Sequence, residues 1–288
     1  MDDETTERAI EKVQKINQKI GYPTENPDIM DPESLAAYYE TVHVKSDTFF
    51  NNTLTFRTFD VATDWAALGK PNQHQFGMTA STVNAYYSPV NSEIVFPAGI
   101  MQQPVFDIEL PAYVSYGAFG SVAGHELSHA FDSTGRHYDQ HGNLTDWWSN
   151  STVKAFEERA QCFVDQYAKF SVPGPDNKAI HVNGRLTLGE NIADAGGLSA
   201  SFQAWTRRAK EKPNPHLPGL EHFTQEQLFF VSYSNWWCGK SRPDTAVNRI
   251  YTDPHSPKWA RVLGTMANSR EFRESFQCES KEPTCELW

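Results

Sequence analysis

The stretch GHELSHAFD, residues 124–132, decides the fold of this chain. It lies in a helix-like segment, residues 116–131, and positions i and i+4 share one face of a helix. The imidazoles of His125 and His129 can therefore reach one metal ion, and the carboxylate of Glu126 points to the same space. A carboxylate at that point can take a proton from a metal-activated water. The alternative is a helix whose two histidines are merely packed or solvated.

A second acidic motif, GENIAD at residues 189–194, offers the ligand that the first stretch lacks. A catalytic zinc needs a third protein ligand and an open position for water, and Glu190 is the candidate. Asp194 follows one helical turn later, where it can accept a hydrogen bond from a ligand histidine and fix its tautomer. Two solvated carboxylates are the alternative, but the residues around them are too small and apolar for an exposed face. We expect one Zn²⁺ per chain, bound by His125, His129 and Glu190.

The composition of the chain excludes several classes of function. Its 288 residues are 39% hydrophobic, which is ordinary for a soluble globular protein with a sizeable core. The formal net charge of −11, without a basic cluster, argues against binding to nucleic acid or to anionic membranes. No run of eighteen apolar residues is present, and the charged N-terminus is unlike a signal peptide. We therefore expect either a cytosolic protein or a chain whose N-terminal part lies outside this sequence.

Periodicity predicts a mainly helical chain with a small β region. Apolar residues at helical spacing, Ile10, Val13, Ile16 and Ile20, predict a first helix over residues 5–20. Two short β-prone runs, residues 83–87 and 93–96, predict a hairpin or edge-strand pair around a Ser-Pro turn. Further helices are expected from Glu33 through residue 50 and at residues 116–131, 151–170, 188–211 and 224–237, with short helices and turns from Pro243 onward. The fold class is therefore α+β, mostly helical with a small antiparallel sheet edge.

At this point the chain resembles the neprilysin family of zinc metallopeptidases, and the resemblance runs over nearly its whole length. The motifs that carry it are GHELSHAFD and GENIADAGG together with VNAYY (83–87), EIVFPAGI (93–100), DWW (146–148), WWCG (236–239), PHSP (254–257), RVLGT (261–265) and the ending CELW (285–288). The resemblance implies a thermolysin-like core. It also implies an activity, the zinc-dependent hydrolysis of oligopeptides on the amino side of hydrophobic residues.

The resemblance also implies roles for single residues. It makes Glu126 the general base and Asp194 the residue that orients a ligand histidine. His255 would donate a hydrogen bond to the oxyanion, and Arg261 would bind the substrate carbonyl beyond the scissile bond. By residue type alone these two read as a turn histidine and a surface arginine. The substrate-binding residues implied are Asn84 and Ala85 by strand addition, and the apolar walls Ile100, Val105 or Phe106, Val122 and Trp237.

Members of that family are more than twice as long as this chain, and the difference raises alternatives. Residues 1–80 would be the helical N-terminal part of the catalytic domain, and residues 81–288 the zinc peptidase domain itself. A helical domain that roofs the site would lie upstream, as a possible partner, in proteins that are membrane-anchored or secreted. The alternatives are a catalytically impaired fragment that only binds peptides, and an aminopeptidase with the same metal ligands.

Four cysteines and three N-glycosylation patterns bear on the compartment. The patterns begin at Asn51, Asn143 and Asn150 and fit a secretory route. The residue types alone leave disulfides and buried thiols equally open. The resemblance implies a bond between Cys162 and Cys285. It leaves Cys238 and Cys278 unpaired here, because their partners would lie in the absent upstream segment.

Overall fold

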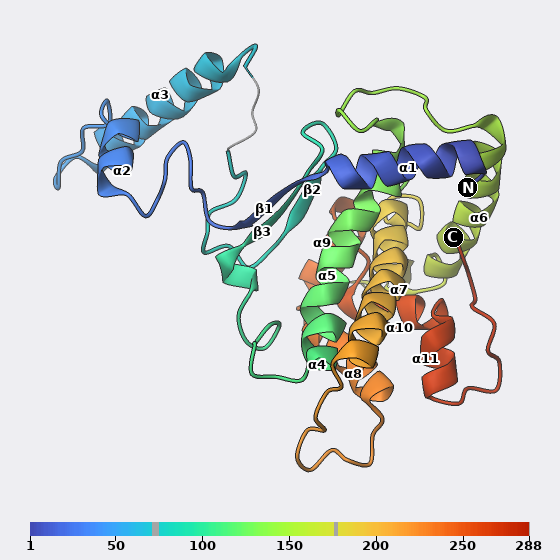
Figure 1. The fold of residues 1–288 in the computed structure, drawn as a ribbon. Coiled ribbons are helices and arrows are strands. Elements are labelled where there is room, and N and C mark those ends of the chain that lie inside the picture. Colours follow the sequence, from blue (N-terminus) through green and yellow to red (C-terminus); the bar gives the residue numbers. More distant parts are fainter. Residues whose placement is uncertain (71–74, 176–177, 288) are drawn as a thin grey trace.

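The computed structural model describes residues 1–70, 75–175 and 178–287, which fold mainly into helices (Figure 1). The helices are α1 (Asp3–Lys15), α2 (Pro32–Tyr38), α3 (Phe49–Ala67), α4 (Ala112–Ser115), α5 (Ser121–Ser128), α6 (Asn150–Tyr167), α7 (Leu188–Glu211), α8 (Gln225–Trp236), α9 (Pro243–Thr252), α10 (Lys258–Ala267) and α11 (Arg270–Ser275). A π-helical turn, Tyr116–Gly120, joins α4 to α5, and a 3₁₀ turn, His129–Phe131, continues α5. Among the described helices, none has the length and apolar character needed to cross a bilayer.

Two small sheets complete the fold. Strands β1 (Asn17–Gly21), β2 (Tyr86–Ser88) and β3 (Glu93–Pro97) form one sheet, in which β3 is central. The pair β2–β3 is antiparallel, as expected, whereas β1 pairs with β3 in parallel. The apolar face of this sheet packs against α5 through Ile94, Phe96 and Val122. The second sheet is the hairpin of β4 (Ser171–Pro173) and β5 (Ala179–His181). The first sheet thus forms one wall beside α5.

The structure confirms the α+β class and most of the expected helices, with two corrections. The first helix was expected to continue to residue 20, but it ends at Lys15, and residues 17–21 form β1. Ile16 already has an extended backbone, because the chain turns there to pair with β3. The helix expected from Glu33 to residue 50 ends at Tyr38, ahead of the β-branched stretch Thr41–Val44, and α3 begins only at Phe49. The division at residue 81 stays a prediction.

Helices α5 and α7 lie side by side and touch through their backbones (Figure 1). Gly124 on α5 faces Gly197 on α7, where an added Cβ would lie 2.4 Å from the backbone nitrogen of His125. Side chains cannot separate the two helices at this point. The motif residues of α5 and those at the start of α7 are therefore held within reach of one another.

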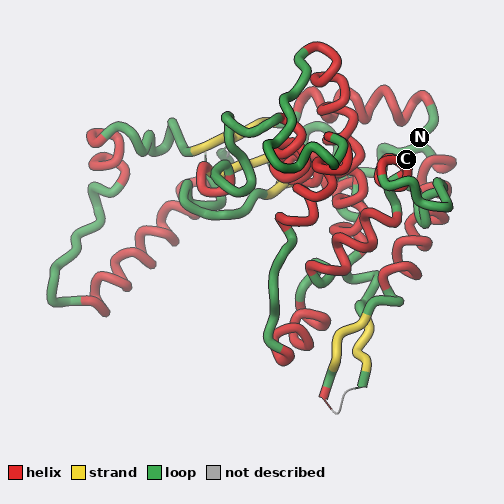
Figure 2. The backbone as a smooth tube through the Cα atoms, turned by 90° about the horizontal axis from the view of Figure 1, so that it is seen from below, coloured by secondary structure: helices red, strands yellow, loops and turns green. Residues whose placement is uncertain are grey.

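The arm, residues 32–68 with α2 and α3, lies away from the other helices in both views (Figures 1 and 2). Neither helix has a buried residue. Large apolar side chains of α3 and its end are exposed instead: Phe49, Phe50, Leu54, Phe56, Val61, Trp65 and Leu68. The expected "helical N-terminal part" is thus two unlike pieces, because α1 and β1 pack into the body while the arm does not.

The C-terminal end is tied to α6 by a disulfide. Cys162 and Cys285 are bonded, as the resemblance implied, across a sequence separation of 123 residues. Cys238 and Cys278 are unpaired, also as expected. Trp288, the last residue of the CELW motif, lies outside the described residues.

Candidate metal centre and catalytic cleft

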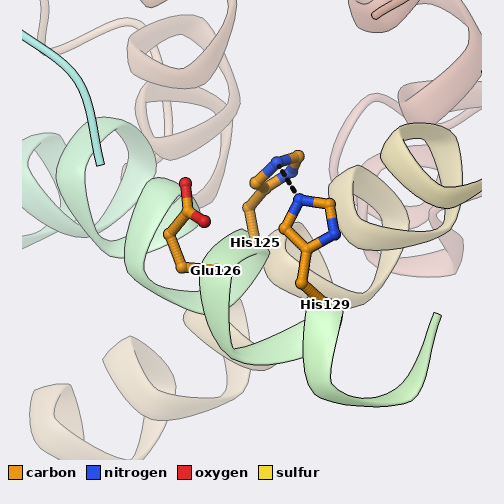
Figure 3. A group of neighbouring side chains, drawn as sticks. All are labelled: His125, Glu126 and His129. Atoms are coloured by element: carbon orange, nitrogen blue, oxygen red, sulfur yellow. Dashed lines mark hydrogen bonds between the residues drawn. The ribbon is translucent and has the colours of Figure 1, made fainter. Parts of the chain in front are cut away.

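Helix α5 brings the first three candidate residues together. The ligand atoms of His125, Glu126 and His129 all lie within 4.8 Å of one another. Figure 3 shows the two imidazoles pointing toward each other from successive turns, with the Glu126 carboxylate beside them. The two Nε2 atoms are 3.0 Å apart. The i, i+4 spacing therefore brings the two imidazoles together, as expected from the sequence.

Glu190 reaches the same point from α7. Its Oε2 atom lies 3.2 Å from Nε2 of His125 and 3.6 Å from Nε2 of His129. Oε2 of Glu190 is thus nearly as close to the two imidazoles as they are to each other, so Glu190 is placed where a third ligand would be. Glu126 is buried within the same cluster and is left for another role.

Two further carboxylates contact the histidines at their Nδ1 atoms. Oδ1 of Asp194 lies 2.9 Å from Nδ1 of His125, and Oδ2 of Asp132 lies 2.6 Å from Nδ1 of His129. The Oδ1 atom of Asp132 in turn accepts hydrogen bonds of 2.7 Å from the backbone N–H groups of Thr134 and Gly135. The Nδ1 atom of each imidazole therefore lies beside a carboxylate, and the two Nε2 atoms face one another in the site.

These contacts fit a zinc ion. Three lone-pair atoms, the Nε2 atoms of His125 and His129 and Oε2 of Glu190, converge on one place. That oxygen is buried and forms no hydrogen bond of good geometry to any described residue. Two imidazoles and one carboxylate are a ligand set of catalytic zinc sites, which keep a fourth position open for water or substrate. The residues present therefore match the expected ion.

Electrostatics distinguish the two glutamates. Burial raises the pKa of the Glu126 carboxyl above its usual value, which makes it a stronger base than a surface glutamate. Burial acts in the same direction on Glu190, but the close contacts of its carboxylate with His125, His129 and His255 hold its pKa well below the usual range. For His129, burial lowers the pKa, yet the contacts with Asp132 and Glu190 prevail and raise it to about 10.

The segment after α9 places His255 beside these residues. Its Nε2 atom lies 3.2 Å from Oε2 of Glu190, and its Nδ1 atom lies 2.8 Å from Oδ1 of Asp253. The side chain remains 40% exposed, so a ligand in the cleft can reach it. His255 is therefore held in place from one side and open to the cleft on the other.

Arg261 is not the surface arginine that its residue type suggests. It is buried on α10, where Nε and Nη2 donate hydrogen bonds of 2.7 and 2.6 Å to the two carboxylate oxygens of Asp194. Its guanidinium also lies 3.8 Å from the ring centroid of Trp237. Asp194 thus links a candidate ligand, His125, to Arg261, and the three residues form one rigid unit.

A cleft of about 440 Å³ surrounds the cluster. Most of the residues that the sequence suggested for the site line this cleft, although they come from distant segments of the chain. Besides the residues above, the lining includes Asn84 and Ala85, Val122, Ile100 and Trp237. Val105 and Phe106, the two alternatives for a pocket wall, do not line it; Val105 is buried and Phe106 packs on Phe119. The wall expected from them is made by other residues.

Sequence reasoning missed two carboxylates, Asp132 and Asp253. Asp132 was quoted within GHELSHAFD, and its place three residues after His129 is compatible with a contact. Asp253 precedes PHSP by one residue and holds His255. A search for an acidic residue within three positions of each candidate histidine would have found both.

Comparison with known proteins identifies the family of this chain. The model of peptidase family M13 matches residues 84–286. The chain is 44% identical to an endothelin-converting enzyme homolog of Locusta migratoria and to human endothelin-converting enzyme 1, and 41% identical to neprilysin-3 of Drosophila melanogaster. Each alignment covers the whole of this chain but only 36–39% of the relative. The chain thus spans little more than a third of these relatives.

Solved structures show the same arrangement of the backbone. The Mycobacterium tuberculosis zinc metalloprotease Zmp1, in complex with an inhibitor, superposes with a TM-score of 0.85 at 34% identity, over 99% of this chain and 42% of that one. PepO from Lactobacillus rhamnosis superposes with a TM-score of 0.80 at 26% identity, also over 99% of this chain. The resemblance to the neprilysin family is confirmed, and the chain belongs to peptidase family M13.

Proposed function

We propose that this chain is the catalytic part of a zinc metalloendopeptidase that hydrolyses oligopeptides, with Glu126 as the general base. The observation that carries the proposal is the convergence of Nε2 of His125, Nε2 of His129 and Oε2 of Glu190 beside the buried carboxylate of Glu126. Membership of family M13 supports it, as do relatives named as endothelin-converting enzymes and neprilysins.

Proton transfer is the task assigned to Glu126. Zinc, when bound, would supply a Lewis acid that polarises a carbonyl oxygen and acidifies water. Glu126 accepts the proton of the attacking water and later delivers it to the leaving amine. Burial, which raises its pKa, brings the carboxylate closer to the strength that such a relay needs.

Two side chains that carry N–H groups, His255 and Arg261, are proposed to donate hydrogen bonds to oxygens of the substrate. We assign His255, held by Asp253, to the oxyanion that develops at the scissile carbonyl. Arg261 has Nε and Nη2 engaged by Asp194, and we assign its Nη1 group to the carbonyl after the scissile bond. Both donors are fixed before substrate arrives, so little reorganisation is needed during the reaction.

The cleft suggests how a peptide would lie. Asn84 and Ala85 immediately precede β2 at the cleft wall, where an extended peptide can add by backbone hydrogen bonds. Ile100, Val122 and Trp237 give part of the lining an apolar character. We therefore propose cleavage on the amino side of hydrophobic residues.

Cleavage of blocked peptides tests this function. Peptides that are acetylated at the N-terminus and amidated at the C-terminus are digested, and the products are located by mass spectrometry. We expect cuts before Phe or Leu, no cuts in the matched peptide with Asp at that position, loss of activity with a chelator and recovery with Zn²⁺. Cleavage only of unblocked peptides would favour the aminopeptidase alternative, and protein that takes up no zinc would contradict the site.

A peptide-binding fragment without turnover is the second candidate. Two observations favour it: the chain spans 36–39% of its curated relatives, and the arm leaves a large apolar surface exposed. Binding of a blocked peptide to the 288-residue chain without hydrolysis, alongside hydrolysis by a longer natural form, would establish this candidate. Equal turnover by both forms would exclude it.

We also propose a partner and a compartment. The additional sequence of a longer natural form would pack on the exposed apolar side chains of α3, since contiguous exposed apolar surface marks interaction sites. The disulfide between Cys162 and Cys285 and the glycosylation patterns suit an extracellular or membrane-anchored protein. A shift in mass on treatment with an N-glycosidase supports that location, and protein recovered only from the cytosol with reduced cysteines contradicts it.

A further inference from the structure

Lys12 of α1 is buried in an unusual way for a lysine. The residue is 0% exposed, although lysines almost never are fully buried unless they are paired. Its ammonium donates three hydrogen bonds to backbone carbonyls, at 2.7 Å to Ala130, 2.9 Å to Gly135 and 2.7 Å to Tyr138. An ammonium has three N–H groups, so each has a partner. The rings of Phe131 and Trp147 lie 5.4 and 5.5 Å from the nitrogen and enclose it.

The three acceptors all belong to one segment, residues 130–138, which directly follows the ligand histidine. Helix α1 lies across the end of α5 at this place (Figure 1). The acceptor carbonyls of Ala130 and Gly135 flank Asp132 on both sides in the sequence. A single cation thus holds together the two ends of the turn that carries Asp132.

That turn determines where the Asp132 carboxylate points. One of its oxygens accepts hydrogen bonds from the N–H groups of Thr134 and Gly135, and the other lies 2.6 Å from Nδ1 of His129. Gly135 also lies so close to His129 that an added Cβ would be 1.8 Å from its carbonyl oxygen. A small displacement of the segment would therefore move the carboxylate away from the imidazole.

The buried ammonium of Lys12 also remains charged, and this charge needs an explanation. Burial lowers the pKa of Lys12 to about 8, while the attraction of Asp132 and Asp139 opposes that shift. The side chain is consequently still charged at neutral pH. Burying an ammonium is unfavourable unless its hydrogen bonds are all satisfied, and a methionine of similar length would avoid that penalty. A lysine at position 12 is therefore better explained by the three backbone carbonyls that its ammonium binds than by the packing of its carbon chain.

We propose that Lys12 is a positioning residue of the metal centre: it holds segment 130–138 so that Asp132 keeps His129 in its ligating orientation. The inference rests on the proposed zinc site. It gives a role to α1, which lies outside the part matched by the family model. Loss of a partner behind a ligand histidine typically weakens metal binding by about 10–100-fold.

The test is the zinc dissociation constant of the 288-residue chain, measured by competition with a chromophoric chelator. Lys12→Met should raise this constant on the order of 10–100-fold. The matched control is Lys15→Met on the same helix, where the exposed ammonium pairs with Glu11, and it should bind zinc as the unsubstituted protein does. Zinc binding by Lys12→Met within about twofold of the unsubstituted protein would overturn the proposal.

Double variants separate positioning from a general loss of stability. If Lys12 acts through Asp132, Lys12→Met should change zinc affinity less than about twofold in an Asp132→Asn background. In an Asp194→Asn background, where the other histidine has lost its carboxylate, it should keep its full effect. Equal effects in both backgrounds would show that Lys12 supports the fold alone and would overturn the proposal.

Two further outcomes are distinguishable. If Lys12→Met does not fold, Lys12→Gln, which retains two N–H donors, is measured against the same twofold criterion. If the unsubstituted protein binds no zinc, the proposed function fails, and this inference fails with it. Normal zinc binding by the unsubstituted protein with no effect of either variant contradicts only the role of Lys12.

Discussion

The arm and the pair of metal-site helices, α5 and α7, use apolar residues in opposite ways. Helix α3 carries four Phe, one Leu and one Trp, yet none of its residues is buried. Helix α5 contains only two large apolar residues, but five of its eight residues are buried, His125 and Glu126 among them. Burial thus follows from what lies opposite a helix and not from its composition. Helices α5 and α7 pack on each other within this chain, whereas the arm leaves its apolar side chains exposed.

The largest effect expected from this difference concerns activity. Glu126→Gln should lower peptide hydrolysis at least ~10²-fold, because an amide cannot accept the proton of the attacking water. Zinc content, measured by mass spectrometry of the metal, should be unchanged, since the three ligands remain. The matched change on the arm is Asp64→Asn, an exposed carboxylate of α3, which should leave both quantities unaltered. An active Glu126→Gln variant would assign the base to another residue.

The second effect concerns stability and compares two tryptophans. Trp205 on α7 is 2% exposed and packs on Tyr113, Phe202 and Phe229, whereas Trp65 on α3 is 71% exposed. Trp205→Ala should lower the free energy of unfolding by roughly 3–5 kcal/mol. Trp65→Ala should change it by no more than about 0.5 kcal/mol in the 288-residue chain. Denaturant titration measures both, and a large loss with Trp65→Ala would mean that the arm is folded against something in solution.

The smallest expected effect concerns the contact between α5 and α7. In Gly197→Ala the new methyl group would lie 2.4 Å from the backbone nitrogen of His125, so the helices must separate. We expect a loss of roughly 1–3 kcal/mol in the free energy of unfolding, together with weaker zinc binding. Ala62→Val on α3 adds more volume at an exposed position and should have no measurable effect on either. Unchanged zinc affinity in Gly197→Ala would show that the site tolerates a wider helix spacing.

The convergence of the candidate zinc ligands could be predicted from the sequence because much of its signal is local. The two histidines lie four residues apart, on α5 and on the 3₁₀ turn that continues it, and the bounds expected for the second helix, residues 188–211, are those of α7. The position of Glu190 beside the histidines was also expected, from the motifs GHELSHAFD and GENIAD. The roles of Asp132 and Asp253 depend on how loops fold back onto the histidines, which no periodicity reveals.

Helix α1 shows why the rest could not be predicted. The spacing of Ile10, Val13, Ile16 and Ile20 predicted a helix to residue 20, but Ile10 and Val13 are exposed, and Ile20 lies on β1. The face that is buried in α1 carries Thr5, Ala9 and Lys12. The carbonyl groups that accept hydrogen bonds from Lys12 belong to segment 130–138, far along the chain. The general rule that lysines lie at the protein surface therefore selects the wrong face of α1. The parallel pairing of β1 with β3 is equally non-local.

The disulfide between Cys162 and Cys285 has a consequence for the covalent topology of the site. The two cysteines enclose Glu190, Asp194, His255 and Arg261, whereas His125, Glu126 and His129 precede the enclosed segment. A single cut by another protease in the mostly exposed connection between α7 and α8, residues 212–224, would therefore release no fragment. The nicked molecule would remain one covalent unit under oxidising conditions. Only a reductant would then separate the piece that carries His255 and Arg261 from the piece that carries the three zinc ligands.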